Sequence, residues 1–459
     1  MQPQSITTMK ILQLVVLIFF ILSTTYCSKR VDPPEVIPDP EPTIIFEIPQ
    51  TEDIVMYEVN LRAFSNAGDL KRVTSNLNHI KSLGVNVIWL MPIYPIGEIN
   101  SVNSPYSVKN YTQVNPEFGT LADLKELVIS AHNNNMAVIL DWVANHTAWD
   151  NPWINNPDWY TQDGSGNIVI PPGTNWQDVA DLNFDNQQMR LEMIESMQYW
   201  IDSANVDGFR CDAADMVPFD FWKQAIDSLD HFNTKELVML AEGGRSDHFT
   251  AGFDLNFSWD FYTQIKKVFS NTASPSSLYA TNTAEYQNIP NGKQKLRFTT
   301  NHDESAWDAT PMVLFNGKNG ALAASVITIY LSGTPLIYDG QEVGVVEKIP
   351  FFTKSPIDWT LNPDMLSEYN RMLAFYNTST TLKTGALTTY NDASVVAFKY
   401  QLNTDETVVL VNTKNSAISF ELPDELINTQ WSNAMNEASI TLTNPLEMQP
   451  YGYLILTGN

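Results

Sequence analysis

The chain has 459 residues, of which 44% are hydrophobic and 11% aromatic, so it can bury a sizeable core and is not disordered as a whole. Its 26 Lys and Arg residues against 52 Asp and Glu residues give a formal net charge of −26, which repels phosphate backbones and excludes nucleic acid as an expected partner. Only 17% of the residues are charged, so the polar surface is largely neutral and suits a ligand rich in hydroxyl groups.

Residues 1–27 are predicted to be a signal peptide. The apolar run 11–22 is too short to span a bilayer but has the length of a signal-peptide core. Cys27, shortly after this run, resembles the cysteine that carries the lipid of a bacterial lipoprotein. Simple secretion and an uncleaved anchor are the alternatives. We therefore expect an extracytoplasmic protein, either anchored by lipid to a membrane of the cell envelope, in the periplasm or at the cell surface, or secreted.

Residues 28–50 are predicted to be an extended linker that holds the following domain away from a surface. This stretch is acidic, and its prolines are too dense for a helix or a central strand. The chain has two cysteines, Cys27 and Cys211, which excludes a disulfide framework and the spacings of zinc or iron–sulfur sites. No organic cofactor is expected.

Residues 51–376 are predicted to form a barrel of the α/β class. Short β-branched or apolar runs alternate with longer amphipathic stretches such as 121–133 and 219–232, which is typical of a parallel sheet with crossover helices. Eight such runs indicate a closed (β/α)8, or TIM, barrel. The predicted strands are residues 54–59, 85–90, 137–140, 206–209, 237–241, 253–257, 296–299 and 335–338.

Two further regions interrupt or follow this alternation. Residues 142–188, after the third predicted strand, contain aromatics, prolines and a turn-forming DGSGN sequence, and we expect an inserted subdomain there. Residues 377–459 show alternating strand patterns without a helical period and are predicted to be a C-terminal all-β domain, a β-sandwich. Its predicted strands are residues 395–400, 407–412, 418–422 and 453–457.

Carboxylates follow several of the predicted barrel strands, at the end of the barrel where active sites lie. Asp141 ends the third strand, Asp212 the fourth and Glu242 the fifth, and Asp303 follows the seventh. Paired carboxylates without a metal cluster or a nucleotide-binding loop indicate cleavage of a glycosidic bond, in which one acid protonates the leaving oxygen and the other attacks or activates water. Any single one of them, taken alone, is more often a cap of the next helix.

The segments around these carboxylates resemble the four signature segments of the α-amylase family of glycoside hydrolases. They are DWVANH at 141–146, GFRCDA at 208–213, Glu242 after VMLA, and FTTNHD at 298–303. Two supporting matches are ADLN at 180–183 and GTPLIYDGQE at 333–342. The resemblance extends over about residues 53–457, and it implies a (β/α)8 barrel that acts on α-glucans.

The resemblance also implies roles for individual residues. Asp212 stands at the position of the nucleophile, and Arg210 on the same strand face would hold it ionised and oriented. Glu242 stands at the position of the general acid/base. Asp303 matches the third carboxylate, which binds sugar hydroxyls and favours the distorted ring without proton transfer.

Three further residues match positions that bind the cleaved sugar. His146 and His302 match histidines that hydrogen-bond its hydroxyls, and Tyr106 resembles the aromatic residue that stacks on its ring. The aromatic residues of the insertion either form further sugar subsites or pack that subdomain, and the sequence does not decide between these. They are Trp149, Trp153, Trp159, Tyr160 and Trp176.

Many members of the family bind a structural calcium, and Asn145 and Asp181 stand at two of its usual ligand positions. Two ligands do not make a site, so the sequence leaves a bound Ca²⁺ and an absent Ca²⁺ as equal alternatives. The chain departs from starch-cleaving members at Asp215 and Met216, where they often carry Lys-His. A second calcium loop is reduced to residues 66–69, where no metal is expected.

The sequence therefore predicts a retaining α-glucan hydrolase that cleaves α-1,4 bonds of starch or maltooligosaccharides through a covalent glycosyl-Asp intermediate. An α-1,6-cleaving or exo-acting glucosidase and a transglycosylase are alternatives within the family. A non-catalytic glucan-binding lipoprotein is the alternative from another class, but it predicts loss of Asp212, Glu242 or Asp303, which are all present. Oligomeric state is left open.

Overall fold

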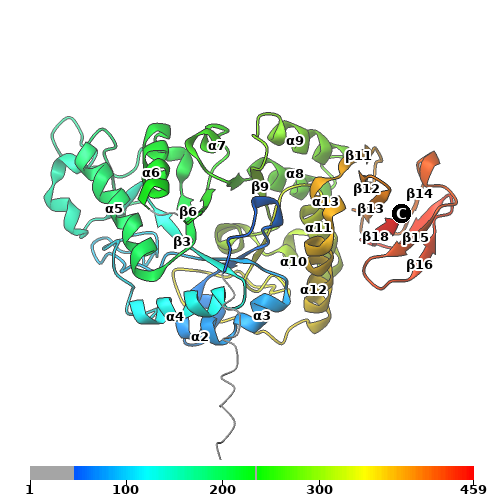
Figure 1. Cartoon of the computed structure of the whole chain (residues 1–459), viewed down its shortest axis with the longest axis horizontal. Coiled ribbons are helices and arrows are strands. Elements are labelled where there is room, and N and C mark those ends of the chain that lie inside the picture. Colours follow the sequence, from blue (N-terminus) through cyan, green and yellow to red (C-terminus); the bar gives the residue numbers. More distant parts are fainter. Residues whose placement is uncertain (1–45, 233–234, 459) are drawn as a thin grey trace, which may run out of the picture. The chain divides into compact units, whose positions relative to one another are not determined.

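The computed structural model describes residues 46–232 and 235–458 of the chain (Figure 1). The predicted signal peptide, Cys27 and most of the predicted linker lie outside these residues, so the lipoprotein prediction is not addressed by the structure. Within the described ranges, no helix has the length and apolar character needed to cross a membrane.

Eight parallel strands close into a barrel, which confirms the predicted fold class (Figure 1). Each predicted strand corresponds to one strand of this barrel, and β9 lies two residues earlier than the pattern indicated. In chain order the strands are β1 (Met56–Val59), β2 (Val87–Leu90), β3 (Ala137–Val143), β6 (Gly208–Asp212), β7 (Val238–Ala241), β8 (Leu255–Phe257), β9 (Gln294–Arg297) and β10 (Thr334–Tyr338). The barrel order is β1-β10-β9-β8-β7-β6-β3-β2.

The barrel strands are buried on both faces. One set of alternate residues fills the barrel interior and includes Trp89, Ile139, Leu240 and Phe257, all fully buried. The other set points outward and packs against the surrounding helices, which is why these strands read as continuous apolar runs rather than as an alternating pattern.

Helices surround the barrel. The predicted helix at 219–232 has the bounds of α6, and the one at 121–133 corresponds to α4, which begins with a reciprocal cap between Thr120 and Asp123. The helices are α1 (Leu61–Phe64), α2 (Leu70–Ser75), α3 (Leu77–Ser82), α4 (Leu121–His132), α5 (Gln187–Ala204), α6 (Phe219–Phe232), α7 (Asp247–Ala251), α8 (Trp259–Phe269), α9 (Ser276–Tyr286), α10 (Pro311–Leu314), α11 (Lys318–Tyr330), α12 (Pro363–Thr378) and α13 (Thr380–Thr384).

The insertion begins later than predicted. Strand β3 continues through the buried residues Trp142 and Val143, so the inserted segment leaves the barrel after Val143 rather than at residue 142. Its two short strands, β4 (His146–Ala148) and β5 (Val179–Asp181), pair antiparallel and place His146 opposite Asp181. This pairing ties the start and end of the insertion together beside the barrel mouth.

The C-terminal region is all β, as predicted, but the helical part extends further than residue 376. Helix α12 ends at Thr378, and α13, which begins at the Ser379 cap, ends at Thr384. A six-stranded antiparallel sheet follows, in the order β11-β12-β13-β18-β15-β16, and it shares an apolar core with the β14-β17 pair. The strands are β11 (Ala386–Tyr390), β12 (Val395–Leu402), β13 (Asp405–Asn412), β14 (Ile418–Phe420), β15 (Gln430–Asn433), β16 (Ser439–Thr441), β17 (Leu446–Met448) and β18 (Tyr453–Gly458).

Candidate active site

A cavity of ≈ 730 Å³ lies at the carboxyl ends of the barrel strands. The structure brings the three predicted catalytic carboxylates and the three predicted sugar-binding side chains Tyr106, His146 and His302 to its wall, while Arg210 is fully buried. The lining residues are Val102, Ser104, Tyr106, His146, Asn175, Trp176, Gln177, Asp178, Val179, Asp212, Ala213, Glu242, His302, Asp303, Trp307, Phe351 and Phe352.

Arg210 connects the carboxylates at the bottom of this cavity. Its Nη1 lies 2.7 Å from Asp141 Oδ1 and 3.2 Å from Asp212 Oδ1, and its Nη2 lies 2.8 Å from Glu242 Oε1. The guanidinium also stacks over the ring of Trp89 at 4.8 Å. One buried cation thus serves three carboxylates, which fixes their positions relative to one another.

The strand pairing explains this arrangement. Arg210 and Asp212 are two residues apart on β6, so their side chains lie on the same face of the strand. The register of β3 and β6 places Asp141 directly beside Arg210. The next residue, Ala213, has φ 43° and ψ 40°, a left-handed conformation that is costly for a residue with a Cβ. This turn aims the Ala213 N–H at Glu242 Oε2, to which it donates a hydrogen bond of 2.7 Å.

The carboxylates at the mouth outnumber the nearby positive charge. Burial raises the pKa of Asp212 well above its ordinary value, and the neighbouring Glu242 raises it further, while Arg210 acts in the opposite direction. Burial also raises the pKa of Asp141 against the effect of Arg210. Closely spaced carboxylates of this kind are typical of sites that perform acid–base chemistry.

His302 contacts Glu58, Asp303 and Tyr106. Its Nδ1 lies 2.5 Å from Glu58 Oε1, its Nε2 lies 2.8 Å from the Tyr106 hydroxyl, and Asp303 Oδ2 is 3.4 Å away. Burial disfavours the charged imidazole, but Asp303 and Glu58 outweigh it and raise the pKa of His302 to about 9. A doubly protonated ring donates to both Glu58 and Tyr106, and Tyr106 in turn donates to Asp141 Oδ2 at 3.0 Å.

Sequence reasoning missed Glu58 and Trp89. Glu58 lies in the middle of the buried strand β1, where a charged residue has no packing role, and this was the available signal. Trp89 on β2 donates its indole N–H to Asp141 Oδ2 at 3.0 Å, and nothing in its apolar sequence context distinguishes it from a core residue.

His146 differs from His302 although both line the cavity. Burial lowers the pKa of His146 to about 4, so its ring is neutral at physiological pH. The ring packs edge-on against Trp176, with centroids 5.4 Å apart. A neutral imidazole beside an aromatic ring can exchange hydrogen bonds with sugar hydroxyls without adding charge to the site.

Among the aromatic residues of the insertion, Trp176 lines the cavity and the others pack the subdomain. Trp149 donates its indole N–H to the Gln177 carbonyl, Trp153 packs against Trp159, and Tyr160 is buried. The cavity receives aromatic rings from elsewhere that sequence reasoning missed, namely Trp307, Phe351 and Phe352. These lie between or after the motifs, in loops whose place at the mouth depends on the closed barrel.

Asp215 holds the loop that follows Glu242. Its Oδ2 accepts from the Gly244 N–H at 3.0 Å and its Oδ1 from the Arg245 N–H at 3.3 Å. Arg245 in return donates from Nη1 to the Asp215 carbonyl at 3.0 Å. A Cβ at Gly243 would lie 2.3 Å from Asp215 Oδ1, so this close approach requires a glycine.

Asn145 and Asp181, the two predicted calcium ligands, lie close to each other at the paired strands of the insertion. The Leu182 N–H donates to the Asn145 carbonyl at 3.2 Å, and both side chains are buried. Burial raises the pKa of Asp181, a cost that a cation would offset. Across the ranges that the structure covers, no group of three or more His, Cys, Asp and Glu residues could hold a metal. The donors are suited to Ca²⁺, but they are fewer than the about six to eight oxygens it takes.

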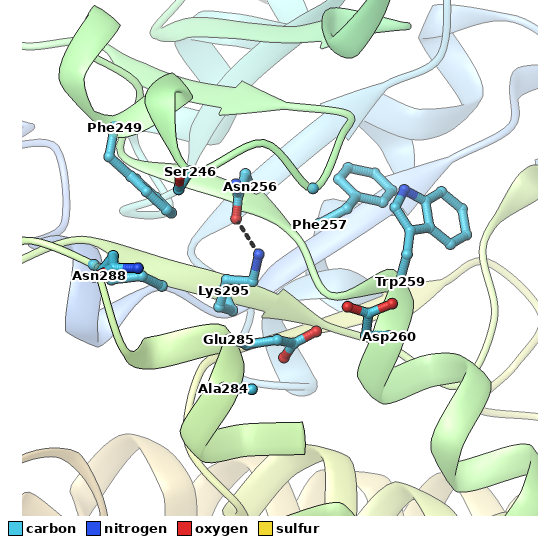
Figure 2. Close-up of a pocket in the computed structure, with 12 residues that line it drawn as sticks. Ser246, Phe249, Asn256, Phe257, Trp259, Asp260, Ala284, Glu285, Asn288 and Lys295 are labelled. Atoms are coloured by element: carbon cyan, nitrogen blue, oxygen red, sulfur yellow. Dashed lines mark hydrogen bonds between the residues drawn. The ribbon is translucent and has the colours of Figure 1, made fainter. Parts of the chain in front are cut away.

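A second, smaller cavity of ≈ 210 Å³ lies on the outer face of β8 and β9 and shares no lining residue with the first (Figure 2). Figure 2 shows the Lys295 amine directed at Asn256 Oδ1, at 2.6 Å. Burial lowers the pKa of Lys295 to about 8. Glu285 at the wall of this cavity is paired with Arg297.

Comparison with known proteins agrees with this geometry. Residues 50–166 and 173–385 match the family model described as "Alpha amylase, catalytic domain". The solved α-amylase of Lactobacillus plantarum superposes with a TM-score of 0.80 at 26% identity, covering 89% of this chain and 99% of that one.

Two curated relatives show the extent of the sequence match. "Alpha-amylase 3" of Dictyoglomus thermophilum is 28% identical over 360 residues, which are 70% of this chain and 70% of the relative. "Alpha-amylase MalA" of Haloarcula japonica is 29% identical over 310 residues, which are 64% of this chain. The match spans 44% of the length of that haloarchaeal relative, less than half of it.

Proposed function

The chain belongs to the α-amylase family of glycoside hydrolases, and from this membership we propose that it is a retaining α-glucan hydrolase that cleaves α-1,4-glucosidic bonds of starch or maltooligosaccharides. The observation that carries the proposal is the contact of a single buried guanidinium with both Asp212 and Glu242 at the barrel mouth. Both carboxylates lie within 3.2 Å of Arg210, which supports the short separation that retaining glycosidases use.

The first half of the proposed reaction breaks the glycosidic bond. Glu242 donates a proton to the bridging oxygen, so that the leaving sugar departs as an alcohol. Asp212 attacks the anomeric carbon from the other face and forms a glycosyl ester. Arg210 favours the ionised form of Asp212, in opposition to the burial and the neighbouring Glu242 that raise its pKa.

The second half hydrolyses the ester. Glu242, now ionised, takes a proton from a water molecule that attacks the anomeric carbon, and the bond to Asp212 breaks. The sugar is released with its original anomeric configuration, Asp212 is again a carboxylate and Glu242 is again protonated. Two inversions at one carbon are the reason for net retention.

The remaining residues hold the cleaved sugar. Tyr106 offers an aromatic face on which the apolar face of a pyranose packs. His302 would donate from Nε2 to a sugar hydroxyl in place of the Tyr106 hydroxyl, while Asp303 offers a carboxylate acceptor. Hydrogen bonds to charged groups are about twice as strong as neutral ones. His146 adds a neutral partner. Bonds that shorten as the ring flattens would lower the barrier to cleavage.

A product profile tests this proposal. The protein is incubated with amylose, pullulan and maltoheptaose, and the products are separated with their anomeric form recorded early. Short maltooligosaccharides released from amylose as α-anomers are expected. Initial β-anomers would contradict retention, while glucose alone, pullulan cleavage or transfer products would move the specificity to an exo-acting, α-1,6-cleaving or transglycosylating enzyme. Absence of turnover on every α-glucan would favour a glucan-binding lipoprotein.

The proposal includes the place of the enzyme in the cell. A lipid on Cys27 would anchor the protein to the membrane of the cell envelope, and residues 28–50 would separate the barrel from that surface. Labelling with a radioactive fatty acid is expected for the wild type and absent for Cys27→Ser. Equal labelling of the two would contradict lipidation at this residue, and an unlabelled wild type would indicate secretion or an uncleaved anchor.

A further inference from the structure

Lys295 is a buried amine that has no part in the proposed chemistry. It lies on β9 and is 4% exposed, and the register of β8 and β9 places Asn256 beside it. Its Nζ donates to Asn256 Oδ1 at 2.6 Å (Figure 2). Within residues 46–232 and 235–458, this is the one hydrogen bond that Nζ makes. A lysine is almost never buried without a charged partner, so Lys295 is an exception that packing does not explain.

Lys399 on β12 is a matched lysine that does have charged partners. It is 9% exposed, and its Nζ lies 2.9 Å from Glu406 Oε1 and 3.6 Å from Glu425 Oε1. Burial disfavours its ammonium form, but the two carboxylates outweigh burial and raise the pKa of Lys399. Two lysines of similar burial therefore differ in whether a carboxylate holds the amine in its charged form.

The charged groups around Lys295 do not reverse the effect of burial. Burial lowers the pKa of Lys295 to about 8, although Glu285 of α9, Asp260 of α8 and Asp215 favour the ammonium, while Arg297 of β9 disfavours it. Glu285 is itself paired with Arg297. At pH 7 roughly a tenth of the Lys295 amines are neutral, against roughly one in a few thousand for an ordinary lysine.

The Lys295 side chain lines the cavity of ≈ 210 Å³ on the outer face of β8 and β9. Gly244, Ser246, Asp260 and Asn288 also line this cavity and are exposed, so the cavity opens to solvent. Its volume is below the about 300 to 1,000 Å³ of pockets for drug-sized ligands, which restricts it to small molecules. A neutral amine that donates one N–H to Asn256 keeps its lone pair available to a molecule in this cavity.

We propose that Lys295 is a covalent modification site for small aldehydes, which enter this cavity and form an imine with the amine. The Nζ lone pair bonds to the carbonyl carbon, the two amine protons leave with the carbonyl oxygen as one water molecule, and a C=N bond remains. Lysines desolvated in pockets are the amines that form such Schiff bases in proteins. Hydrolysis of an α-glucan supplies one source, because the new reducing end is an aldehyde in its open-chain form.

The cavity adjoins the loop that follows Glu242. Asn256, which accepts from Lys295, donates from Nδ2 to the Arg245 carbonyl at 3.1 Å, and Gly244 of the same loop lines the cavity. An adduct on Lys295 would occupy the cavity and contact this loop. The modification would therefore lower activity by displacing the loop, since the cavity shares no lining residue with the active-site cavity.

The test treats the whole protein with glyceraldehyde or glucose in the presence of cyanoborohydride, which reduces an imine to a stable amine, and locates the label by peptide mass spectrometry. At pH 7, Lys295 should be labelled about tenfold or more faster than two controls, the ion-paired Lys399 and the exposed Lys125. Its labelling rate should level off near pH 8. Labelling of Lys295 no faster than that of Lys125 would overturn the site.

The two probes distinguish the sources of the aldehyde. Labelling of Lys295 by both would support the site and include reducing sugars among its ligands. Labelling by glyceraldehyde alone would support the site for smaller aldehydes and exclude the sugar product as the source. The measurement does not depend on turnover, so an absence of activity on α-glucans would concern the proposed function alone.

Lys295→Arg is the matched variant for the effect on activity, because a guanidinium can still donate to Asn256 but does not form the imine. After labelling with glyceraldehyde, the wild type should lose activity on soluble starch by about threefold to tenfold, and Lys295→Arg treated in the same way should keep its activity. Equal losses in the two proteins, or no loss in either, would overturn the effect on the loop.

Discussion

Two arginines of the barrel strands are both fully buried and surrounded in different ways. Arg297, at the end of β9, faces outward and donates to Glu285 at 2.5 Å, to Asn282 Oδ1 at 2.6 Å and to the Ser332 carbonyl at 3.1 Å. One positive charge meets one negative charge and two neutral acceptors. It is a buried structural ion pair, and removing one partner of such a pair strongly destabilises the folded state.

Arg210 at the mouth has three carboxylate neighbours instead of one. Asp141, Asp212 and Glu242 together carry more negative charge than one guanidinium balances, and the pKa of Asp212 is raised in consequence of its burial and of Glu242. The comparison shows that a buried cation with matched partners supports the fold, whereas an excess of carboxylates beside an open cavity supports chemistry.

The largest effect on activity is expected from replacing the acid side chain of Glu242. Glu242→Gln keeps the shape of the side chain but cannot donate a proton, so kcat on soluble starch should fall by about 10² to 10⁴. The melting temperature should stay equal or rise, because the substitution relieves the repulsion that raises the pKa of Asp212. Reducing-sugar release and calorimetry measure the two. Wild-type rates in this variant would contradict the assigned role of Glu242.

The matched substitution, of Arg297 on the outer face of the barrel, should lower stability and leave activity unchanged. Arg297→Met leaves Glu285 buried without its cation, so the free energy of unfolding should fall by about 3 to 5 kcal/mol. Activity per folded molecule should be unchanged, since Arg297 does not line the active-site cavity. Denaturant unfolding checks the first expectation, and adding Glu285→Gln should recover part of the loss. A large fall in kcat without a loss of stability would erase the distinction between the two arginines.

A smaller effect is expected on the pH dependence of activity. His302 has a pKa raised to about 9, above its ordinary 6.5, so the stability it contributes is complete below pH 6.5 and is lost as the pH rises through about 9. Glu58→Gln removes one of the negative charges that raise this pKa. The alkaline limb of kcat/KM should therefore move down by roughly one pH unit. An unmoved limb would show that His302 does not set the alkaline limit.

Asp215 is expected to position the loop that follows Glu242, although it lies outside the cluster of Arg210 and its three carboxylates. Asp215→Ala removes the acceptor for the Gly244 and Arg245 N–H groups, which should loosen the loop after Glu242 and lower kcat by about three- to tenfold with little change in KM. Asp215→Asn keeps one acceptor oxygen and should recover part of this loss. A change confined to KM would indicate contact with substrate instead.

The smallest expected effect tests calcium at the insertion. If Asn145 and Asp181 hold Ca²⁺, chelation with EDTA should lower the melting temperature by about 3 to 8 °C, because an ion bound only to the folded state stabilises it by mass action. Asp181→Asn should reduce this difference. A melting temperature that neither chelator nor added Ca²⁺ changes would contradict the prediction.

Local patterns were sufficient for much of the fold and for the motif residues. The eight barrel strands were identified because parallel strands buried on both faces appear as continuous apolar runs. The boundaries were less accurate, since β3 and the last helical turns continue through residues whose burial depends on their neighbours. Asp212, Glu242 and Asp303 occupy short motifs at strand ends, which predicted that they meet at one mouth, and the structure places all three on the wall of one cavity.

Trp307, Phe351 and Phe352 were not found because nothing in their own segments marks them, and the local signal of Glu58, a charged residue in a buried strand, does not indicate its partner. Glu58 reaches His302 only because the barrel closes β1 against β10 and brings the first strand beside the last. Trp307 and Phe351 meet because loops after β9 and β10 converge at the same mouth. Their partners are distant in the sequence, so no local pattern contains them.

The sequence by itself determined the class of the fold, the all-β C-terminal region and the identity of the motif carboxylates, because hydrophobic period and short motifs are properties of neighbouring residues. The tertiary structure alone decided that Arg210 serves three carboxylates, that His302 is held charged while His146 is neutral, and that an exposed tryptophan stands beside the site. Charge balance and burial depend on which distant residues come together, and only the closed barrel sets that.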